Sequence, residues 1–156
     1  MFELLCTAKD DLAQALYFAR FLLKKGWHYE PWERRWTIYM QQTAFTTALV
    51  VSYSRPFVKS RGWPDFPERL LNYDQGQRQL HKRLIRMRNE VYAHSDIASR
   101  HIRPFKMPNS SFPSRIESQP TMRLTKPETE AVAQMITAMQ QTLSSRIETL
   151  HRNLTK

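Results

Sequence analysis

Thr125-Lys126-Pro127-Glu128 marks the start of the longest helix that the sequence predicts. Thr125 suits the N-cap position and Glu128 the third helical position, so that each side chain can bond the other residue's backbone N–H. Pro127 fits the first turn, where a backbone N–H has no partner within the helix. We therefore predict a helix from Pro127 to about Leu154.

Two helices are predicted in the first third of the chain. One spans residues 9–25, because apolar side chains recur there at helical spacing and Gly26 follows as a C-cap. Pro31 is placed to begin the second helix, which spans residues 32–54 and is broken or kinked by Pro56.

The third helix is predicted over residues 75–94, after a connection at residues 61–72 that has room for at most one helical turn. Apolar residues in this helix recur at i, i+4, i+7 and i+11 and form one narrow stripe. The stripe consists of Leu80, Leu84, Met87 and Val91.

These helices predict a single all-α domain over residues 1–156, a bundle of four long helices with an irregular proline-rich insertion at residues 97–124. The chain has only 3 glycines, which is few for a β-rich fold that must turn often. The insertion is too long for a plain connection and is a short β-hairpin, a functional lid or a mobile loop.

The charge of the chain indicates a polyanionic partner. The formal net charge is +10, from 24 Lys and Arg against 14 Asp and Glu. Such an excess favours RNA and DNA above membranes. A membrane-surface helix would set large apolar residues opposite basic ones, and no segment does so cleanly. We expect a nucleic acid as partner and no membrane.

Cysteine usage and the first residues indicate the compartment. Cys6 is the single cysteine, so no intrachain disulfide can form, and it is expected to be a small buried residue. Residues 1–5 lack the basic start of a signal peptide, and no stretch nears the roughly 18 apolar residues of a membrane span. We expect a cytoplasmic protein.

No cofactor or metal site is predicted. The histidines are scattered at positions 28, 81, 94, 101 and 151, without the short spacings of metal ligands. The glycine patterns that cradle phosphate or a dinucleotide are missing. Any chemistry must therefore come from side chains.

The third helix is the most basic part of the chain. Phosphate contacts are expected along it, although a run of charges also forms an ordinary solvated helix face. Its basic residues are Arg78, Lys82, Arg83, Arg86 and Arg88.

Arg88 and His94 could together cleave an RNA backbone. An unperturbed histidine, with a pKa of about 6.5, gives or takes a proton near neutral pH. The guanidinium of an arginine grips a phosphate and neutralises the charge that develops when a ribose 2′-hydroxyl attacks the phosphorus. No metal is then required.

The stretch Arg88-Asn89-Glu90-Val91-Tyr92-Ala93-His94 resembles the motif of the HEPN (higher eukaryotes and prokaryotes nucleotide-binding) superfamily. That motif is an arginine followed by four to six residues and a histidine, often with asparagine after the arginine. The flanks Met87 and Ser95-Asp96 are similar to members associated with abortive infection and toxin–antitoxin systems. The stretch Tyr53-Ser54-Arg55-Pro56-Phe57 resembles a second feature of the superfamily.

The resemblance implies a helical bundle that dimerises so that two motifs form one metal-independent endoribonuclease site. It implies RNA, a second copy of the chain, and a cognate antitoxin or regulatory protein as partners. Asp96 stands where toxins silenced by adenylylation carry tyrosine, so that silencing is not implied. The expected catalytic residues are Arg88, Asn89 and His94, and the expected RNA-binding residues are Lys82, Arg83, Arg86 and Arg55.

Spacing alone does not single out this motif, because Arg146 and His151 match it too. Asn89 and the basic third helix distinguish the first match. Around an ideal helix Arg88 and His94 lie about 120° apart, so a long side chain, a loosened helix end or a partner's motif must bring both to one phosphate. Their place beside an apolar stripe is what a homodimer interface would show.

Other interpretations stay open at this point. His94 could be a helix-terminal imidazole in contact with Glu90. The chain could be a noncatalytic RNA-binding or adaptor bundle, or a DNA-binding regulator, although no helix-turn-helix is evident. The tryptophans could stack bases, but in a small bundle they are expected in the core. They are Trp27, Trp32, Trp36 and Trp63.

Overall fold

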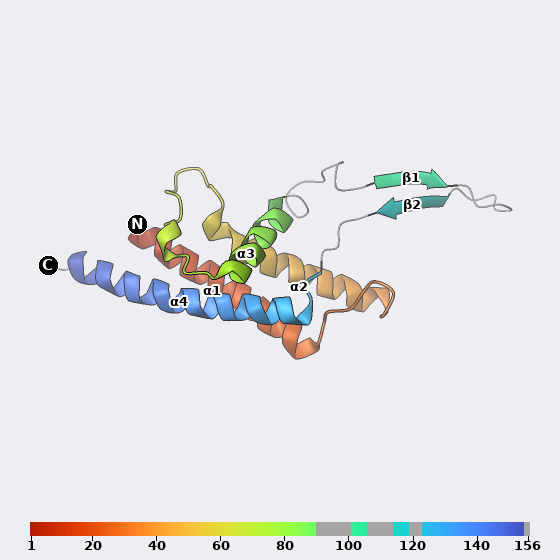
Figure 1. Ribbon diagram of the computed structural model, residues 1–156, viewed down its shortest axis with the longest axis horizontal. Coiled ribbons are helices and arrows are strands. Elements are labelled where there is room, and N and C mark those ends of the chain that lie inside the picture. Colours follow the sequence, from red (N-terminus) through yellow and green to blue (C-terminus); the bar gives the residue numbers. More distant parts are fainter. Residues whose placement is uncertain (90–100, 106–113, 119–122, 155–156) are drawn as a thin grey trace.

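Four α-helices form the fold of the protein in a computed structural model, which describes residues 1–89, 101–105, 114–118 and 123–154 (Figure 1). The all-α class predicted from the sequence is confirmed. The helices are α1 (Phe2–Lys25), α2 (Trp36–Ser54), α3 (Gln75–Met87) and α4 (Lys126–Leu154). The shorter elements are the 3-10 turns η1 (Arg55–Phe57) and η2 (Glu68–Leu70) and the strands β1 (His101–Phe105) and β2 (Ser114–Ser118).

Helix α1 packs against both α2 and α4, and α3 packs against α2 and α4. Figure 1 shows that α2 and α4 both run antiparallel to α1, so that the two ends of the chain lie at the same end of the bundle. Helix α3 crosses the long helices at an angle in this view. Its last turn is therefore carried at the side of the bundle.

The hydrophobic core lies mainly between α1, α2 and α4. Leu5, Leu12 and Ala19 of α1 are completely buried, and their spacing of seven residues keeps them on one face of the helix. Leu84 and Met87 bring the predicted stripe of α3 into the same core. Burial of each such leucine stabilises the fold by about 1.5–3 kcal/mol.

The predicted ends of two helices are confirmed. At the start of α4 the backbone N–H of Thr125 donates to Glu128 Oε2 at 2.8 Å and the backbone N–H of Glu128 donates to Thr125 Oγ1 at 3.4 Å, which is a capping box. Gly26 ends α1 in the left-handed conformation, with φ +63°. A second capping box, in which Asp74 caps the predicted start of α3 with Gln77, was not predicted.

Two predicted helix starts are wrong. Helix α1 begins at Phe2 rather than near residue 9, because Leu4, Leu5 and Ala8 extend its buried face. Helix α2 begins at Trp36 rather than at Pro31, which lies in a turn. The buried amide of Gln42 accepts from the backbone N–H of Tyr29 at 2.8 Å and donates to its carbonyl at 2.9 Å, which holds the preceding segment as a loop.

The exposure of the tryptophans contradicts the expectation that they are core residues. Trp32 is 80% exposed, Trp36 is 65% exposed and Trp63 is 43% exposed. Trp27 alone of the four packs against the core, where it meets Phe45 edge to face. Cys6, expected to be buried, is half-buried.

The sequence predicted that the third helix ends at residue 94 and that an irregular insertion spans residues 97–124. Within the insertion β1 pairs with β2 in an antiparallel register that sets Arg103 opposite Ile116. Helix α3 ends at Met87, and residues 90–100, which include Val91 and the predicted helix end, lie outside the described residues. Within the described ranges, no helix has the length and apolar character needed to cross a membrane.

Candidate functional site

Two of the three predicted catalytic residues follow directly on α3. Arg88 keeps helical backbone angles, with φ −59° and ψ −46°, and its backbone N–H still bonds to the preceding turn. Its guanidinium donates to Asn89 Oδ1 at 3.0 Å. The arginine and the asparagine of the motif are thus in direct contact, and His94 lies outside the described residues.

Asn89 lines a small hollow on the outer side of α3 together with two of the predicted RNA-binding residues, Lys82 and Arg86. The hollow has a volume of about 380 Å³ and is completed by Phe57, His81 and Ile85. Lys82 and Arg86 are exposed one turn apart on the helix. Cations spaced in this way suit the phosphates of one nucleic-acid strand. We call this the basic hollow.

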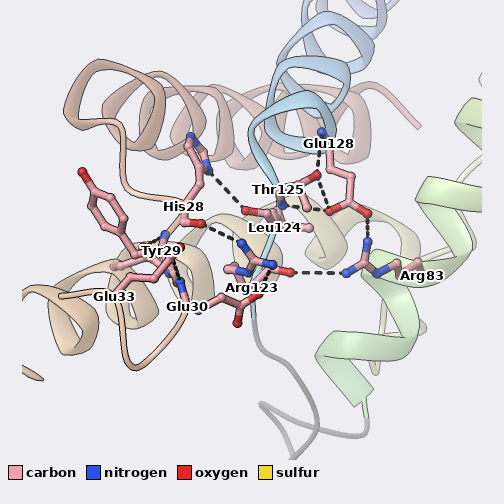
Figure 2. A network of polar contacts seen from close by, with 10 residues as sticks. His28, Tyr29, Glu30, Glu33, Arg83, Arg123, Leu124, Thr125 and Glu128 are labelled. Carbon is pink, nitrogen blue, oxygen red and sulfur yellow. Dashed lines mark hydrogen bonds and ion pairs between the residues drawn. The ribbon is translucent and has the colours of Figure 1, made fainter.

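Arg83, although it is next to Lys82, has a different environment. Its side chain is 32% exposed and forms an ion pair with Glu128, and its second terminal nitrogen donates to the carbonyl of Arg123 at 3.3 Å. Figure 2 shows Arg83 reaching from α3 to the start of α4. Arg83 was predicted to bind RNA, and the described contacts join it to α4 instead.

The ion pair of Arg83 belongs to a larger network around residues 28–30 and 123–128 (Figure 2). Arg123 donates to the carbonyl of His28 at 2.7 Å and forms an ion pair with Glu30. His28 Nδ1 donates to the carbonyl of Leu124 at 3.2 Å. The network therefore joins α3, the loop after α1 and the start of α4, and we call it the anchor network.

Arg55, the fourth predicted RNA-binding residue, lies at the end of α2 in η1. It forms an ion pair with Asp11 at 3.2 Å, and its side chain is 54% exposed. Both residues line a hollow of about 620 Å³ between the first half of α1, η1 and the segment that follows it. We call this the aromatic hollow, because Phe57, Trp63 and Phe66 line it as well.

His81 is the residue that the sequence analysis left without a role. It lines both the basic hollow and the aromatic hollow, as does Phe57, so the two hollows are neighbours. The rings of Phe57 and Tyr53 lie edge to face with the imidazole, at centroid distances of 4.9 and 5.8 Å. The sequence around His81 gave no signal of this, because the rings that surround it come from distant segments.

A buried pair of tyrosines holds His81 in place. Nδ1 of His81 lies 2.9 Å from the hydroxyl of Tyr53, which lies 3.3 Å from the hydroxyl of Tyr73. Burial raises the pKa of Tyr53 well above its usual range, so its hydroxyl keeps its proton. Nε2 of His81 has no hydrogen-bond partner among the described residues, so one ring nitrogen is fixed and the other is left for a ligand.

The charge state of His81 follows from its surroundings. Burial lowers the pKa of its imidazole, and the positive charge of Lys82 lowers it further. His81 is therefore neutral at neutral pH, when one nitrogen can donate and the other accept. A neutral imidazole can bind a ligand through hydrogen bonds, and it adds no charge to the site.

Over the part of the chain that the structure describes, no group of three or more His, Cys, Asp or Glu side chains is placed to hold a metal ion. The charged groups of the basic hollow are Lys82 and Arg86, whose nitrogens suit anions, whereas the lining of the aromatic hollow includes both basic and acidic residues. Comparison of the chain with protein-family models, with curated proteins and with solved structures found no match in any of the three.

Proposed function

We propose that the protein is a metal-independent endoribonuclease of the HEPN type, with Arg88, Asn89 and His94 as its catalytic residues. The observation that carries the proposal is the basic hollow, in which Asn89 of the motif shares one surface with Lys82 and Arg86. A strand of RNA held by these two cations would pass beside the motif. The half-buried Arg88 and the exposed Asn89 at the end of α3 would then meet a phosphate of this strand.

The reaction needs a base, an acid and a cation. His94 takes the proton from a ribose 2′-hydroxyl, whose oxygen attacks the adjacent phosphorus, or gives a proton to the 5′-oxygen that leaves. Arg88 neutralises the charge that develops on the phosphoryl oxygens, and Asn89 holds its guanidinium in place through the 3.0 Å hydrogen bond. The products are a 2′,3′-cyclic phosphate and a free 5′-hydroxyl.

One motif does not supply both an acid and a base, and two copies of the chain would do so. We therefore propose a homodimer in which the ends of the two α3 helices face each other across a two-fold axis. RNA is the proposed substrate, and a cognate antitoxin or regulatory protein is the proposed partner in a cytoplasmic toxin or defence setting. The geometry of the dimer rests on the resemblance of residues 88–94.

The test is cleavage of RNA in the presence of a chelator by the purified protein. His94→Ala is expected to lower the cleavage rate by about 100-fold or more, the usual contribution of a general acid or base. His151→Ala is the matched control, because Arg146 and His151 have the same spacing, and it should cut RNA at the rate of the wild type.

Three outcomes decide the proposal. Cleavage that persists in a clean preparation of His94→Ala would contradict it, and so would equal losses in the two variants. Salt-dependent binding of RNA without cleavage by the wild type would favour the noncatalytic RNA-binding or adaptor bundle instead. A strong preference for duplex DNA would contradict both.

A further inference from the structure

The aromatic hollow has the size and lining of a site for one ring-shaped polar molecule. Its volume of about 620 Å³ lies within the range of about 300–1,000 Å³ that is typical of small-molecule sites. Polar and apolar groups both line it, and they include the indole of Trp63 and the carboxylates of Asp65 and Glu68. Both carboxylates belong to exposed side chains, which can reach a polar ligand in the hollow.

Trp63 offers a face for a flat ligand. Trp63 lines the hollow and is 43% exposed, so part of its indole is not covered by other side chains of the protein. Phe57 and Phe66, which also line the hollow, pack edge to face on each other at a centroid distance of 4.9 Å. Stacking of an unpaired base on an exposed aromatic ring is a common means by which proteins hold single-stranded RNA.

The hydrogen-bonding groups of the hollow limit the kind of base. Asp65 and Glu68 form no ion pair among the described residues, so their carboxylates can accept hydrogen bonds from a ligand. A carboxylate accepts two parallel hydrogen bonds from neighbouring donors. Among the four RNA bases only guanine offers two adjacent donors, N1–H and N2–H₂, on one edge, and uracil offers only one imino N–H.

His81 supplies the remaining contact. The hydroxyl of Tyr53, which keeps its proton, can donate to Nδ1 of His81, and the imidazole then carries its proton on Nε2. An Nε2–H donor suits O6 or N7 of guanine, both of which are acceptors. The contact would come from the wall that the aromatic hollow shares with the basic hollow.

We propose that the aromatic hollow is a subsite for one unpaired guanine of the RNA, stacked on Trp63, bonded at its edge by Asp65 and Glu68, and bonded at O6 or N7 by Nε2 of His81. The phosphate next to this guanine then lies over Lys82 and Arg86 in the basic hollow. The subsite rests on the proposed function for its substrate, RNA, and it adds selection for a base to that function. His81 acts here as a binding residue.

The experiment measures binding separately from cleavage. The probes are short oligonucleotides of 2′-O-methyl uridine, which cannot be cleaved because the attacking hydroxyl is blocked, and each probe carries one guanine, adenine, cytosine or uracil at its centre. The wild-type protein should bind the guanine probe about tenfold more tightly than the uracil probe, the usual discrimination from one bidentate base contact. Fluorescence anisotropy of labelled probes gives the affinities.

Two variants test the residues. The double variant Asp65→Asn with Glu68→Gln should bind the guanine and uracil probes with affinities that differ by less than about twofold, because the charge-assisted pair of hydrogen bonds is lost. Trp63→Ala should bind all four probes about tenfold more weakly, because stacking accepts any base. Trp32→Ala is the matched control, since Trp32 is 80% exposed and does not line the hollow, and it should bind like the wild type.

The outcomes separate the subsite from the ribonuclease. Guanine preference that the double variant abolishes supports the subsite, even if the wild type cuts no RNA and the proposed activity fails. RNA cleavage by the wild type without any preference for guanine overturns the subsite and leaves the ribonuclease standing. Equal losses from Trp63→Ala and Trp32→Ala also overturn it, because stacking is then not confined to the hollow. Circular dichroism spectra identical to the wild type show that each variant is folded.

Discussion

Lys82 and Arg83 are neighbours in the sequence and face two different parts of the molecule. Arg83 points to the start of α4. There its guanidinium forms an ion pair with Glu128 and donates a hydrogen bond to the carbonyl of Arg123, within the anchor network. Lys82 is exposed and lines the basic hollow with Asn89. One helix therefore carries a cation that is open to a ligand and, one residue later, a cation that holds the fold together.

The two histidines His28 and His81 repeat this contrast. His28 donates to the carbonyl of Leu124 inside the anchor network, and its Nε2 is buried without a partner among the described residues. His81 is held by Tyr53 and lines two hollows. Net charge and histidine count say nothing of this difference. Each imidazole has a partner for Nδ1 and none for Nε2 among the described residues, so what separates them is place: Nε2 of His28 is buried inside the fold, whereas His81 lines two hollows that a ligand can enter.

The largest effect is expected from Arg123→Met, which removes the centre of the anchor network. The side chain of Arg123 is 22% exposed and bonds both Glu30 and the carbonyl of His28, so its loss leaves these groups partly buried without a partner. We expect the free energy of unfolding to fall by about 2–3 kcal/mol. For a domain of this size that lowers Tm by about 5–10 °C, which a thermal melt followed by circular dichroism measures. An unchanged Tm would show that the network does not stabilise the fold.

The second prediction compares the free energy of unfolding of two variants, Arg83→Gln and Lys82→Gln, and the expected losses are smaller than for Arg123→Met. Arg83→Gln breaks a half-buried ion pair and should lower the free energy of unfolding by about 1–2 kcal/mol. Lys82→Gln changes an exposed side chain and should change it by less than about 0.5 kcal/mol. Urea denaturation of the two variants gives both values. Equal losses of stability would contradict the division of α3 into an anchored face and an open face.

The fold could be predicted only in part from the sequence. The start of α3, the C-cap at Gly26 and the capping box at Thr125 depend on residues within a few positions, so local pattern is enough to find them. The loop before α2 was missed because Gln42, thirteen positions after Tyr29, holds that loop. The role of Arg83 depends on Glu128, a contact between residues 45 positions apart.

The candidate site divides in the same way. Asn89 and Arg88 could be found because the motif is continuous in the sequence. His81 could not, since the residues that bury and orient it, Tyr53 and Tyr73, belong to other parts of the chain. The exposed tryptophans were missed because a large aromatic residue is assigned to the core by its size alone, and only the fold shows which of them have no neighbours to cover them.

A third prediction compares the two faces of α3 through the salt dependence of RNA binding. Each phosphate contact with single-stranded RNA adds about 0.7 to the slope of log affinity against log salt concentration. Lys82→Gln should reduce this slope by about 0.7 and weaken binding by roughly threefold at low salt. The control is Arg83→Gln with Glu128→Gln, which removes the ion pair and leaves the net charge unchanged, and its slope should equal that of the wild type. A reduced slope in the control would place Arg83 among the RNA contacts.

The fourth prediction concerns the pH dependence of stability. Burial lowers the pKa of His28 and of His81 in the folded protein, and the hydrogen bond of His28 to the backbone of Leu124 does not reverse this. As the pH falls, the unfolded chain therefore binds protons first, near the ordinary histidine pKa of about 6.5. The stability is fully present above about pH 6.5 and is lost as the pH falls below it. Tm between about pH 7.5 and pH 5.5 should fall less in His81→Phe than in the wild type, and exposed His151→Gln serves as the control.

The smallest effect should distinguish the two histidines most directly. RNA bound in the basic hollow would bring a phosphate close to His81 and raise the pKa of its imidazole, because a nearby anion favours the charged form. The pKa of His28, which burial lowers inside the anchor network, should not change when RNA binds. Titration of the histidine ring protons by nuclear magnetic resonance, with and without a 2′-O-methyl oligonucleotide, measures both values, and the variants His28→Gln and His81→Gln assign the signals. A rise confined to His81 places the RNA at the open face of α3, whereas equal rises at both histidines would mean that the anchor network is itself part of the RNA-binding surface.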